Sequence, residues 1–171
     1  GHRTIEDLPR RFGAVATDLR TRRAVLLDSG DAATAIQASI AVPGVFPPVR
    51  TDGRTLVDGV LTSPLPVWAA HRLGATRTIA VRLRPQTPPG ARASVQRMVL
   101  PPAEVIEPDL DIVIDTGGYS SWSARDVDRL VTLGYETTAA VLREVDLDEL
   151  LADDLPACGC PTDHRAARAA S

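Results

Sequence analysis

The amino-acid sequence predicts an α/β fold, and three patterns support that class. Short apolar runs of strand length alternate with segments whose apolar residues recur at helical spacing. A helix-like segment at 65–73 is followed directly by a strand-like one at 78–83, a step typical of α/β sheets. The composition, 44% hydrophobic and 24% charged over 171 residues, is typical of one globular domain.

The first third of the chain predicts two hairpins with a helix between them. The second hairpin is indicated by Asp52-Gly53, because a tight turn of this kind needs positive φ at both of its central residues. The helix is indicated by Asp31, a good capping residue, ahead of a run of helix formers that Pro43-Gly44 closes. We expect the strands of the first hairpin at 11–19 and 24–27, the helix at 31–41, and the strands of the second hairpin at 46–50 and 54–57.

The remainder predicts helices and strands in alternation. Ile79, Val81 and Leu83 alternate with other residues, so we expect a buried strand. In the last segment, apolar residues form one helical stripe, which predicts a long helix covering a sheet face. The expected elements are a helix at 65–73 ended by Gly74, a strand at 78–83, a loop at 84–102 with a short helix possible at 93–100, a strand at 110–115 and a helix at 124–145.

Charge and composition exclude several classes of function. The net charge is −3 with acids and bases interspersed, so we expect no nucleic-acid partner. No apolar run reaches the roughly 20 residues that a membrane-spanning helix needs. Cys158 and Cys160 are too close together in the sequence for a disulfide that stabilises a fold, so we expect none. With His164 they give three candidate metal ligands but no evident fourth, so we expect no metal site. A reducing, cytoplasmic location fits this pattern.

Several motifs follow one another along the chain in a characteristic order. They are Thr17-Asp18-Leu19, the run Ala-Ser-Ile-Ala-Val-Pro-Gly-Val-Phe-Pro-Pro-Val at 38–49, Leu56-Val57-Asp58-Gly59, Pro64-Leu65-Pro66-Val67, Leu73-Gly74-Ala75, the segment 106–110 and Gly134-Tyr135-Glu136. This order resembles that of the patatin-like phospholipase family over about residues 4–142. The resemblance implies a three-layer α/β/α domain with a mixed sheet, of which this chain is the C-terminal portion.

The resemblance also implies a catalytic site. In that family an aspartate activates a serine on a nucleophile elbow without a histidine, and a glycine-rich loop forms the oxyanion hole; Asp58 matches the aspartate. A carboxylate with a pKa near 3.9 is a weak base at neutral pH, so it must be held against the serine hydroxyl. Gly59 and Val60 support the motif, although the family usually has Gly or Ala in place of Val60. The alternative is that Asp58-Gly59 is an ordinary turn, since both residue types dominate turns.

The nucleophile side of the dyad is not evident in the sequence. None of the eight serines lies in Gly-x-Ser-x-Gly; Ser39 sits inside an expected helix, and Gly118-Tyr119-Ser120 gives half of the pattern. No glycine-rich stretch points several N–H groups at an oxyanion. In the family both features precede the Thr-Asp-Leu strand, so we expect residues 1–146 to be the C-terminal part of a patatin-like domain and 147–171 an acidic-to-flexible tail.

Two functions therefore compete. The first is a serine acyl hydrolase that cleaves lipid or other acyl esters with a Ser-Asp dyad, needs no cofactor, and touches membranes peripherally; this chain alone would be inactive. The second is a non-catalytic fragment that associates with itself or another chain through exposed sheet edges.

Overall fold

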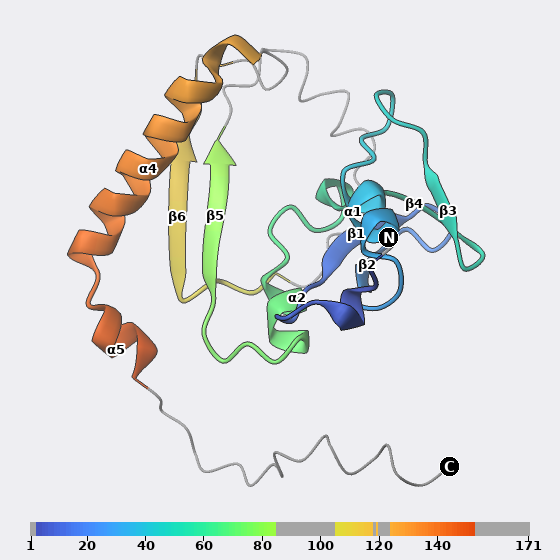
Figure 1. Ribbon diagram of the computed structural model, residues 1–171, viewed down its shortest axis with the longest axis horizontal. Coiled ribbons are helices and arrows are strands. Elements are labelled where there is room, and N and C mark those ends of the chain that lie inside the picture. The colour runs from blue at the N-terminus through green and yellow to red at the C-terminus, as the bar shows by residue number, and fades with distance from the viewer. Residues whose placement is uncertain (1–2, 85–104, 118, 120–123, 153–171) are drawn as a thin grey trace, which may run out of the picture.

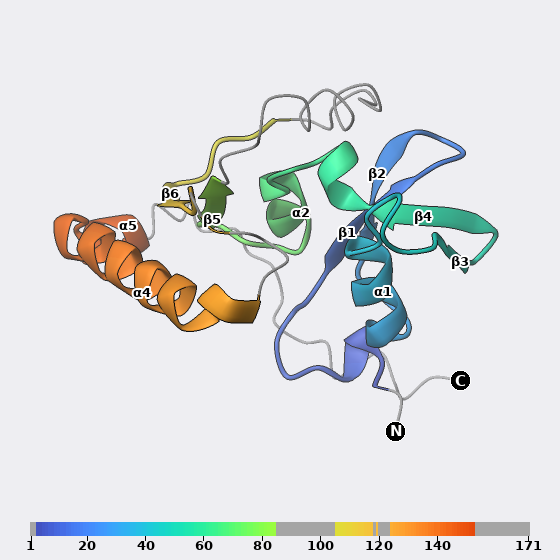
Figure 2. The same cartoon turned by 90° about the horizontal axis from the view of Figure 1, so that it is seen from above.

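The computed structural model describes residues 3–84, 105–117, 119 and 124–152. Figures 1 and 2 show an N-terminal part with four strands around one helix, and a C-terminal part in which a long helix lies along two parallel strands. A short helix, α2 (Val67–Arg72), lies between the two parts in both views. The combination of helices with parallel and antiparallel strand pairs confirms the α/β class, with the parallel and antiparallel pairs in separate sheets.

The N-terminal sheet is antiparallel throughout, in the order β2-β1-β4-β3. Its strands are β1 (Ala14–Asp18), β2 (Arg23–Leu27), β3 (Val49–Thr51) and β4 (Arg54–Asp58). Both predicted hairpins are confirmed. Asp52 and Gly53 have φ of 49° and 70°, as a tight two-residue hairpin turn requires. Arg22 also has positive φ, 59°, in the turn between β1 and β2.

One helix, α1 (Ala32–Ser39), covers this sheet. The Asp31 carboxylate caps it by accepting hydrogen bonds from the N–H and hydroxyl of Thr34 at 2.9 and 2.6 Å, as the sequence predicted. Its buried face is alanine, so the helix approaches the strands closely. Ala38 packs with Ala16 of β1 and Leu56 of β4, and all three side chains have no exposed surface. This packing fixes β1, β4 and the end of α1 relative to one another.

The C-terminal part holds a parallel pair, β5 (Ile79–Arg84) and β6 (Leu110–Asp115), with α4 (Val127–Glu144) alongside β6 (Figure 1). The strand and helix positions are confirmed, but the expected burial of β5 is wrong. Ile79, Val81 and Leu83 are more than half exposed. Val81 pairs with Ile112, and paired residues of parallel strands share a face. Because α4 packs on β6, it buries Ile112 and leaves the neighbouring β5 side chains uncovered.

Four short helices complete the described chain. They are the 3₁₀ turns η1 (Ile5–Asp7), η2 (Gly59–Leu61) and η3 (Ala124–Asp126), and α5 (Leu147–Leu151) is a further single-turn α-helix. Gly74 ends α2 with a φ of 92°, as expected of a helix terminator. The segment expected as a tail from residue 147 therefore begins as a helix. Arg84, the first residue of the loop expected at 84–102, is instead the last residue of β5. The rest of that loop, Ser120, Cys158, Cys160 and His164 fall outside the described residues.

Candidate functional site

Asp58 is the last residue of β4, where the chain leaves the sheet and enters η2. Its carboxylate oxygen Oδ1 accepts a hydrogen bond from the N–H of Val60 at 2.8 Å. Its own N–H donates to the carbonyl of Ala41 at 3.0 Å, which ties the loop after α1 to this point. Within the described part of the chain, the second oxygen, Oδ2, accepts no hydrogen bond. One oxygen is thus fixed and the other is available to an incoming donor.

Gly59, directly after Asp58, lies in close contact with the backbone of β1. Its φ is not in the left-handed region, in contrast to Gly53 of the hairpin turn. What Gly59 provides is space: a Cβ here would lie 2.4 Å from the carbonyl oxygen of Val15 in β1. No side chain fits at that distance. The glycine therefore lets the chain bend against β1 directly after Asp58. Asp58 itself caps η2 through the Val60 N–H, as an aspartate in a turn does, so its catalytic role stays a prediction.

Two buried threonines hold the backbone of Asp58. The hydroxyl of Thr17, in β1, donates to the Asp58 carbonyl at 2.9 Å and lies 2.9 Å from the hydroxyl of Thr62. Since the single Thr17 proton is committed to Asp58, Thr62 donates to Thr17. Both side chains are at most 1% exposed. The sequence marked Thr17 as part of a motif but gave no role for it, and Thr62 was missed, because the contact joins residues 45 apart in the sequence.

A cavity of about 620 Å³ opens beside Asp58. Its walls are mainly apolar and include Ile36, Ile40 and Val60, each close to half exposed. Ser39 and Ser63 also line it, but the Ser39 hydroxyl donates to the Val15 carbonyl at 2.8 Å. Ser63 is buried and accepts from the Trp68 indole at 2.9 Å. The cavity is suited to an apolar ligand next to a single carboxylate.

Asp18, adjacent to Thr17, is a buried carboxylate with a different task. Burial by itself would raise its pKa, but hydrogen bonds from the backbone of Arg20 and from the hydroxyl and N–H of Thr21 outweigh it and lower the pKa. The Asp18 oxygen lies 2.8 Å from the Arg20 nitrogen. Asp18 therefore stays ionised and stabilises the β1–β2 turn, so we assign it a structural role.

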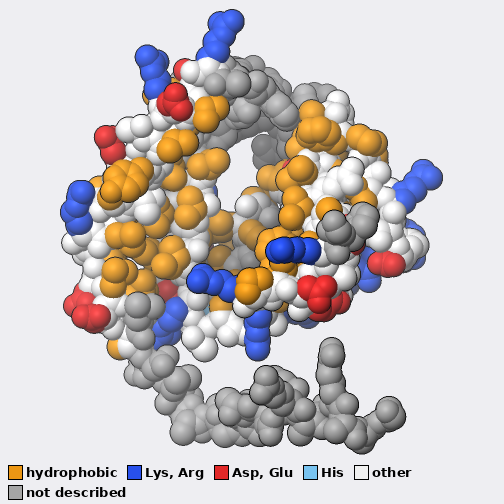
Figure 3. Space-filling model, in the orientation of Figure 1, with side chains coloured by type: hydrophobic (Ala, Val, Ile, Leu, Met, Phe, Trp, Pro, Cys, Tyr) orange, Lys and Arg blue, Asp and Glu red, His pale blue; other side chains and the backbone are white. Residues whose placement is uncertain are grey.

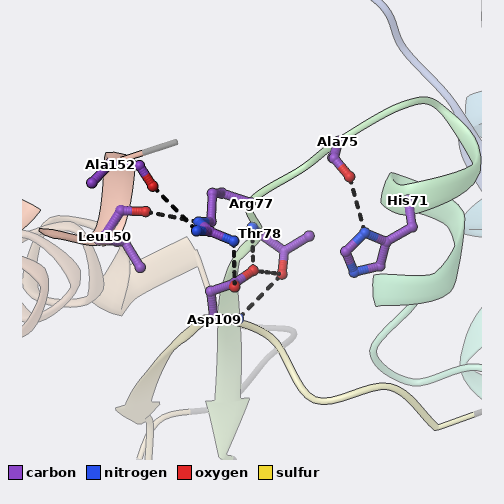
Figure 4. Close-up of polar contacts among 7 residues, drawn as sticks. All are labelled: His71, Ala75, Arg77, Thr78, Asp109, Leu150 and Ala152. Atoms are coloured by element: carbon purple, nitrogen blue, oxygen red, sulfur yellow. Dashed lines mark hydrogen bonds and ion pairs between the residues drawn. The ribbon is translucent and has the colours of Figure 1, made fainter. Parts of the chain in front are cut away.

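A second polar cluster, drawn in Figure 4, organises the C-terminal part. The hydroxyl and N–H of Thr78 both donate to Asp109 at 2.8 Å, and these bonds, with help from Arg77, lower the pKa of Asp109. Arg77 also donates to the carbonyls of Leu150 and Ala152 at the end of α5. His71 sits apart, its Nδ1 2.9 Å from the carbonyl of Ala75. This cluster ties β5, β6 and α5 together. It includes a hydroxyl held against a carboxylate, Thr78 and Asp109, but Thr78 is buried, so we assign the pair a structural role.

Grouped metal ligands and membrane-spanning helices are both absent from the residues that the structure describes. Among them no three His, Cys, Asp or Glu side chains are grouped as metal ligands would be. Nor does any helix in those ranges combine the length and apolarity that a bilayer crossing requires.

Comparison with known proteins finds a family match over the segment that contains Asp58. Residues 1–71 match the model of the family described as patatin-like phospholipase, a span that runs from η1 into α2 and includes Asp58, Gly59 and both threonines. The resemblance to patatin-like phospholipases is confirmed. Asp58 therefore lies inside the patatin-like segment.

Curated proteins described as NTE family members are similar to the same part of the chain in sequence. An uncharacterized NTE family protein of Mycobacterium tuberculosis (strain ATCC 25618 / H37Rv) is 47% identical over 79 residues, which is 46% of this chain and 22% of the relative. Its counterpart in Mycobacterium bovis has the same identity and coverage. A second M. tuberculosis protein of the same description is 41% identical over 66 residues, 39% of this chain and 11% of the relative. The matched part of this chain thus spans about a fifth or less of the length of these relatives.

Proposed function

We propose that this chain supplies the aspartate of a Ser-Asp dyad in a patatin-like enzyme that hydrolyses carboxylic esters of lipids or other apolar acyl groups. The observation that carries the proposal is the state of Asp58. One carboxylate oxygen is held by the Val60 N–H at 2.8 Å, the other has no partner within the described residues, and the residue lines an apolar cavity of about 620 Å³. A base fixed in this way needs only a hydroxyl placed against its free oxygen.

The chemistry assigned to Asp58 has two stages. In the first, the carboxylate takes the proton of a serine hydroxyl as the serine oxygen attacks the ester carbonyl, and the leaving alcohol departs with that proton. In the second, Asp58 takes a proton from water as the water oxygen attacks the acyl-serine, which releases the acid and restores the serine. No metal or organic cofactor enters either stage. The serine and the oxyanion donors are proposed to lie in residues beyond this sequence, in the same gene product or a partner chain.

Val60 is compatible with this role. The position contributes its N–H, which any residue other than proline provides, to the Asp58 carboxylate. The Val60 side chain is 48% exposed and lies on the wall of the cavity, so its extra bulk over Gly or Ala narrows the cavity without displacing Asp58. We therefore assign Val60 to the acyl-binding wall.

The test is Asp58→Asn in the native gene product, assayed with p-nitrophenyl esters of short and medium acyl chains. Loss of the general base is expected to lower kcat by about 10²- to 10⁴-fold. Asp52→Asn is the matched control, because Asp52 also precedes a glycine but sits in the exposed turn of the β3–β4 hairpin at a positive φ that asparagine tolerates. Turnover by Asp58→Asn that is close to that of Asp52→Asn would sink the assignment.

A second candidate function, association through an exposed sheet edge, is favoured by one specific observation. Ile79, Val81 and Leu83 of β5 are 53%, 55% and 62% exposed, and in the described part of the chain β5 pairs with β6 alone. Open strand edges with apolar side chains promote pairing with another chain. Size-exclusion chromatography with light scattering separates the alternatives: a monomer whose mass does not change with concentration counts against this candidate.

A further inference from the structure

A second, more polar pocket adjoins the cavity beside Asp58. Its volume is about 430 Å³, and Phe12 and Leu73 line both it and the Asp58 cavity. Three arginines, Arg10, Arg11 and Arg72, contribute to its wall. They come from two separate elements, the segment leading into β1 and the end of α2, so the fold, and not local sequence alone, brings their charges to one pocket.

The three guanidinium groups are not neutralised by ion pairs within the described residues. Arg10 makes neither a hydrogen bond nor an ion pair there. Arg11 uses one nitrogen, Nη1, to donate to the carbonyl of Leu73 at 2.7 Å, which orients the group and leaves its other N–H bonds available. Arg72 lies over the indole of Trp68, with its Cζ 5.8 Å from the ring centroid, and an arginine stacked in this way keeps all its N–H donors.

Two carboxylates also line the pocket, Glu6 and Asp28, so the wall carries three positive and two negative charges. The Glu6 carboxylate is engaged elsewhere: both of its oxygens accept from the N–H of Gly30, at 3.0 and 3.1 Å. Hydrogen bonds from its own backbone N–H and from Gly30 lower the Glu6 pKa, so the group stays ionised where it is held. The Gly30 N–H orients Glu6 without cancelling its charge, so with Asp28 counted the pocket wall has a net charge of +1 and three guanidinium groups that an anion can reach.

We propose that Arg10, Arg11 and Arg72 form a binding site for a phosphate group. The planar fork of arginine matches the oxygens of phosphate, and pairs of this kind are charge-assisted and often bidentate. Because Phe12 and Leu73 wall both pockets, a phosphate ester bound there extends an apolar part into the cavity beside Asp58. The link to that cavity rests on the proposed function of Asp58, whereas the phosphate site itself does not.

The site is tested by titrating the 171-residue chain with inorganic phosphate at pH 7 and constant ionic strength, following the arginine side-chain NMR signals. We expect saturable shifts at Arg10, Arg11 and Arg72 that weaken as NaCl is added. Arg10→Gln and Arg72→Gln should each weaken binding by at least about threefold, since each removes a partly solvent-screened, charge-assisted contact. Thermal melts of each variant establish that the fold is kept.

Arg50→Gln is the matched control, because it makes the same change of charge on the exposed strand β3, away from the pocket. Three results would overturn the proposal. They are a loss of phosphate affinity in Arg50→Gln equal to that in the pocket variants, a loss of less than about threefold in Arg10→Gln and Arg72→Gln, and NMR shifts spread over all the arginines. Dihexanoyl phosphatidic acid and glycerol 3-phosphate then distinguish the source of the phosphate. Tighter binding of the lipid indicates a lipid headgroup, and equal binding indicates a free phosphate ester.

The phosphate site and the proposed function fail independently. Asp58→Asn is expected to leave the affinity for inorganic phosphate unchanged, since Asp58 is not part of the arginine-lined wall. If Asp58→Asn keeps its esterase turnover while the arginine variants lose phosphate, the dyad assignment fails and the phosphate site stands.

Discussion

Replacing Gly59 by alanine is the perturbation whose cost the structure fixes most directly. The added Cβ would lie 2.4 Å from the carbonyl oxygen of Val15 and 3.0 Å from its carbonyl carbon, against 3.4–4 Å for ordinary contact. The clash is with the backbone of β1, which pairs with β2 on one side and β4 on the other. Relief therefore requires a backbone shift of about 1 Å in the chain that follows Asp58.

The expected loss of stability is about 3 kcal/mol, the upper part of the usual range for overpacking, since no flexible side chain can move aside. For a chain of this size that corresponds to a fall in Tm of roughly 6–12 °C. Urea unfolding followed by circular dichroism measures the free energy, and differential scanning calorimetry measures Tm. The same shift moves the Asp58 carboxylate, so esterase turnover of the native gene product should fall together with stability.

Gly134→Ala is the matched control with the opposite sign. Gly134 is in the middle of α4, and a Cβ there would meet the Ile114 side chain at a comfortable 3.8 Å. Alanine in a helix interior is favoured over glycine by about 1 kcal/mol, so this variant should be more stable than the parent chain. A Gly59→Ala chain within about 0.5 kcal/mol of the parent would refute the close-contact explanation of the Asp58-Gly59 motif.

Two further predictions concern groups around this site and in the second sheet. Thr17→Val should lower the free energy of unfolding, measured in urea, by about 2 kcal/mol, because it leaves the Asp58 carbonyl and the Thr62 hydroxyl without their buried partner. Thr17→Ser keeps the hydroxyl and should retain most of that free energy. Equal losses for the two variants would argue against the hydrogen bonds. Asp18 and Asp109 have lowered pKa values, so their stabilisation is present above the unfolded pKa of about 3.9 and is lost as pH falls through the folded pKa. The free energy of unfolding should therefore fall from pH 5 to pH 3, and less steeply in Asp109→Asn; an unchanged slope would contradict the assigned hydrogen bonds.

The sequence predicted the local elements well because their signals are local. Asp31 indicated the start of α1, Asp52-Gly53 the second hairpin, and Gly74 the end of α2. Each of these signals is a conformational preference of the residue itself. The patatin-like motif order also predicted a catalytic role for Asp58, which stays a prediction because no single pattern distinguishes this residue from part of a turn.

Features that depend on contacts between distant residues could not be predicted. The alternation of Ile79, Val81 and Leu83 correctly indicated a strand, but their burial depends on where α4 lies, and α4 covers β6 instead. The role of Gly59 depends on the Val15 carbonyl, and that of Thr62 on Thr17, neither of which is a neighbour in the sequence. The arginine-lined pocket likewise forms only when α2 meets the segment before β1.

The most direct test of the proposed dyad is to compare fluorophosphonate labelling of the native gene product and its Asp58→Asn variant, then identify the labelled peptide. We expect a labelled polypeptide heavier than this chain's 18.2 kDa that contains the Asp58 peptide, with the label on a serine outside the present sequence. Labelling of Asp58→Asn should be slower by about 100-fold or more. Labelling at the same rate in the variant, or on Ser39 or Ser63, would contradict the account.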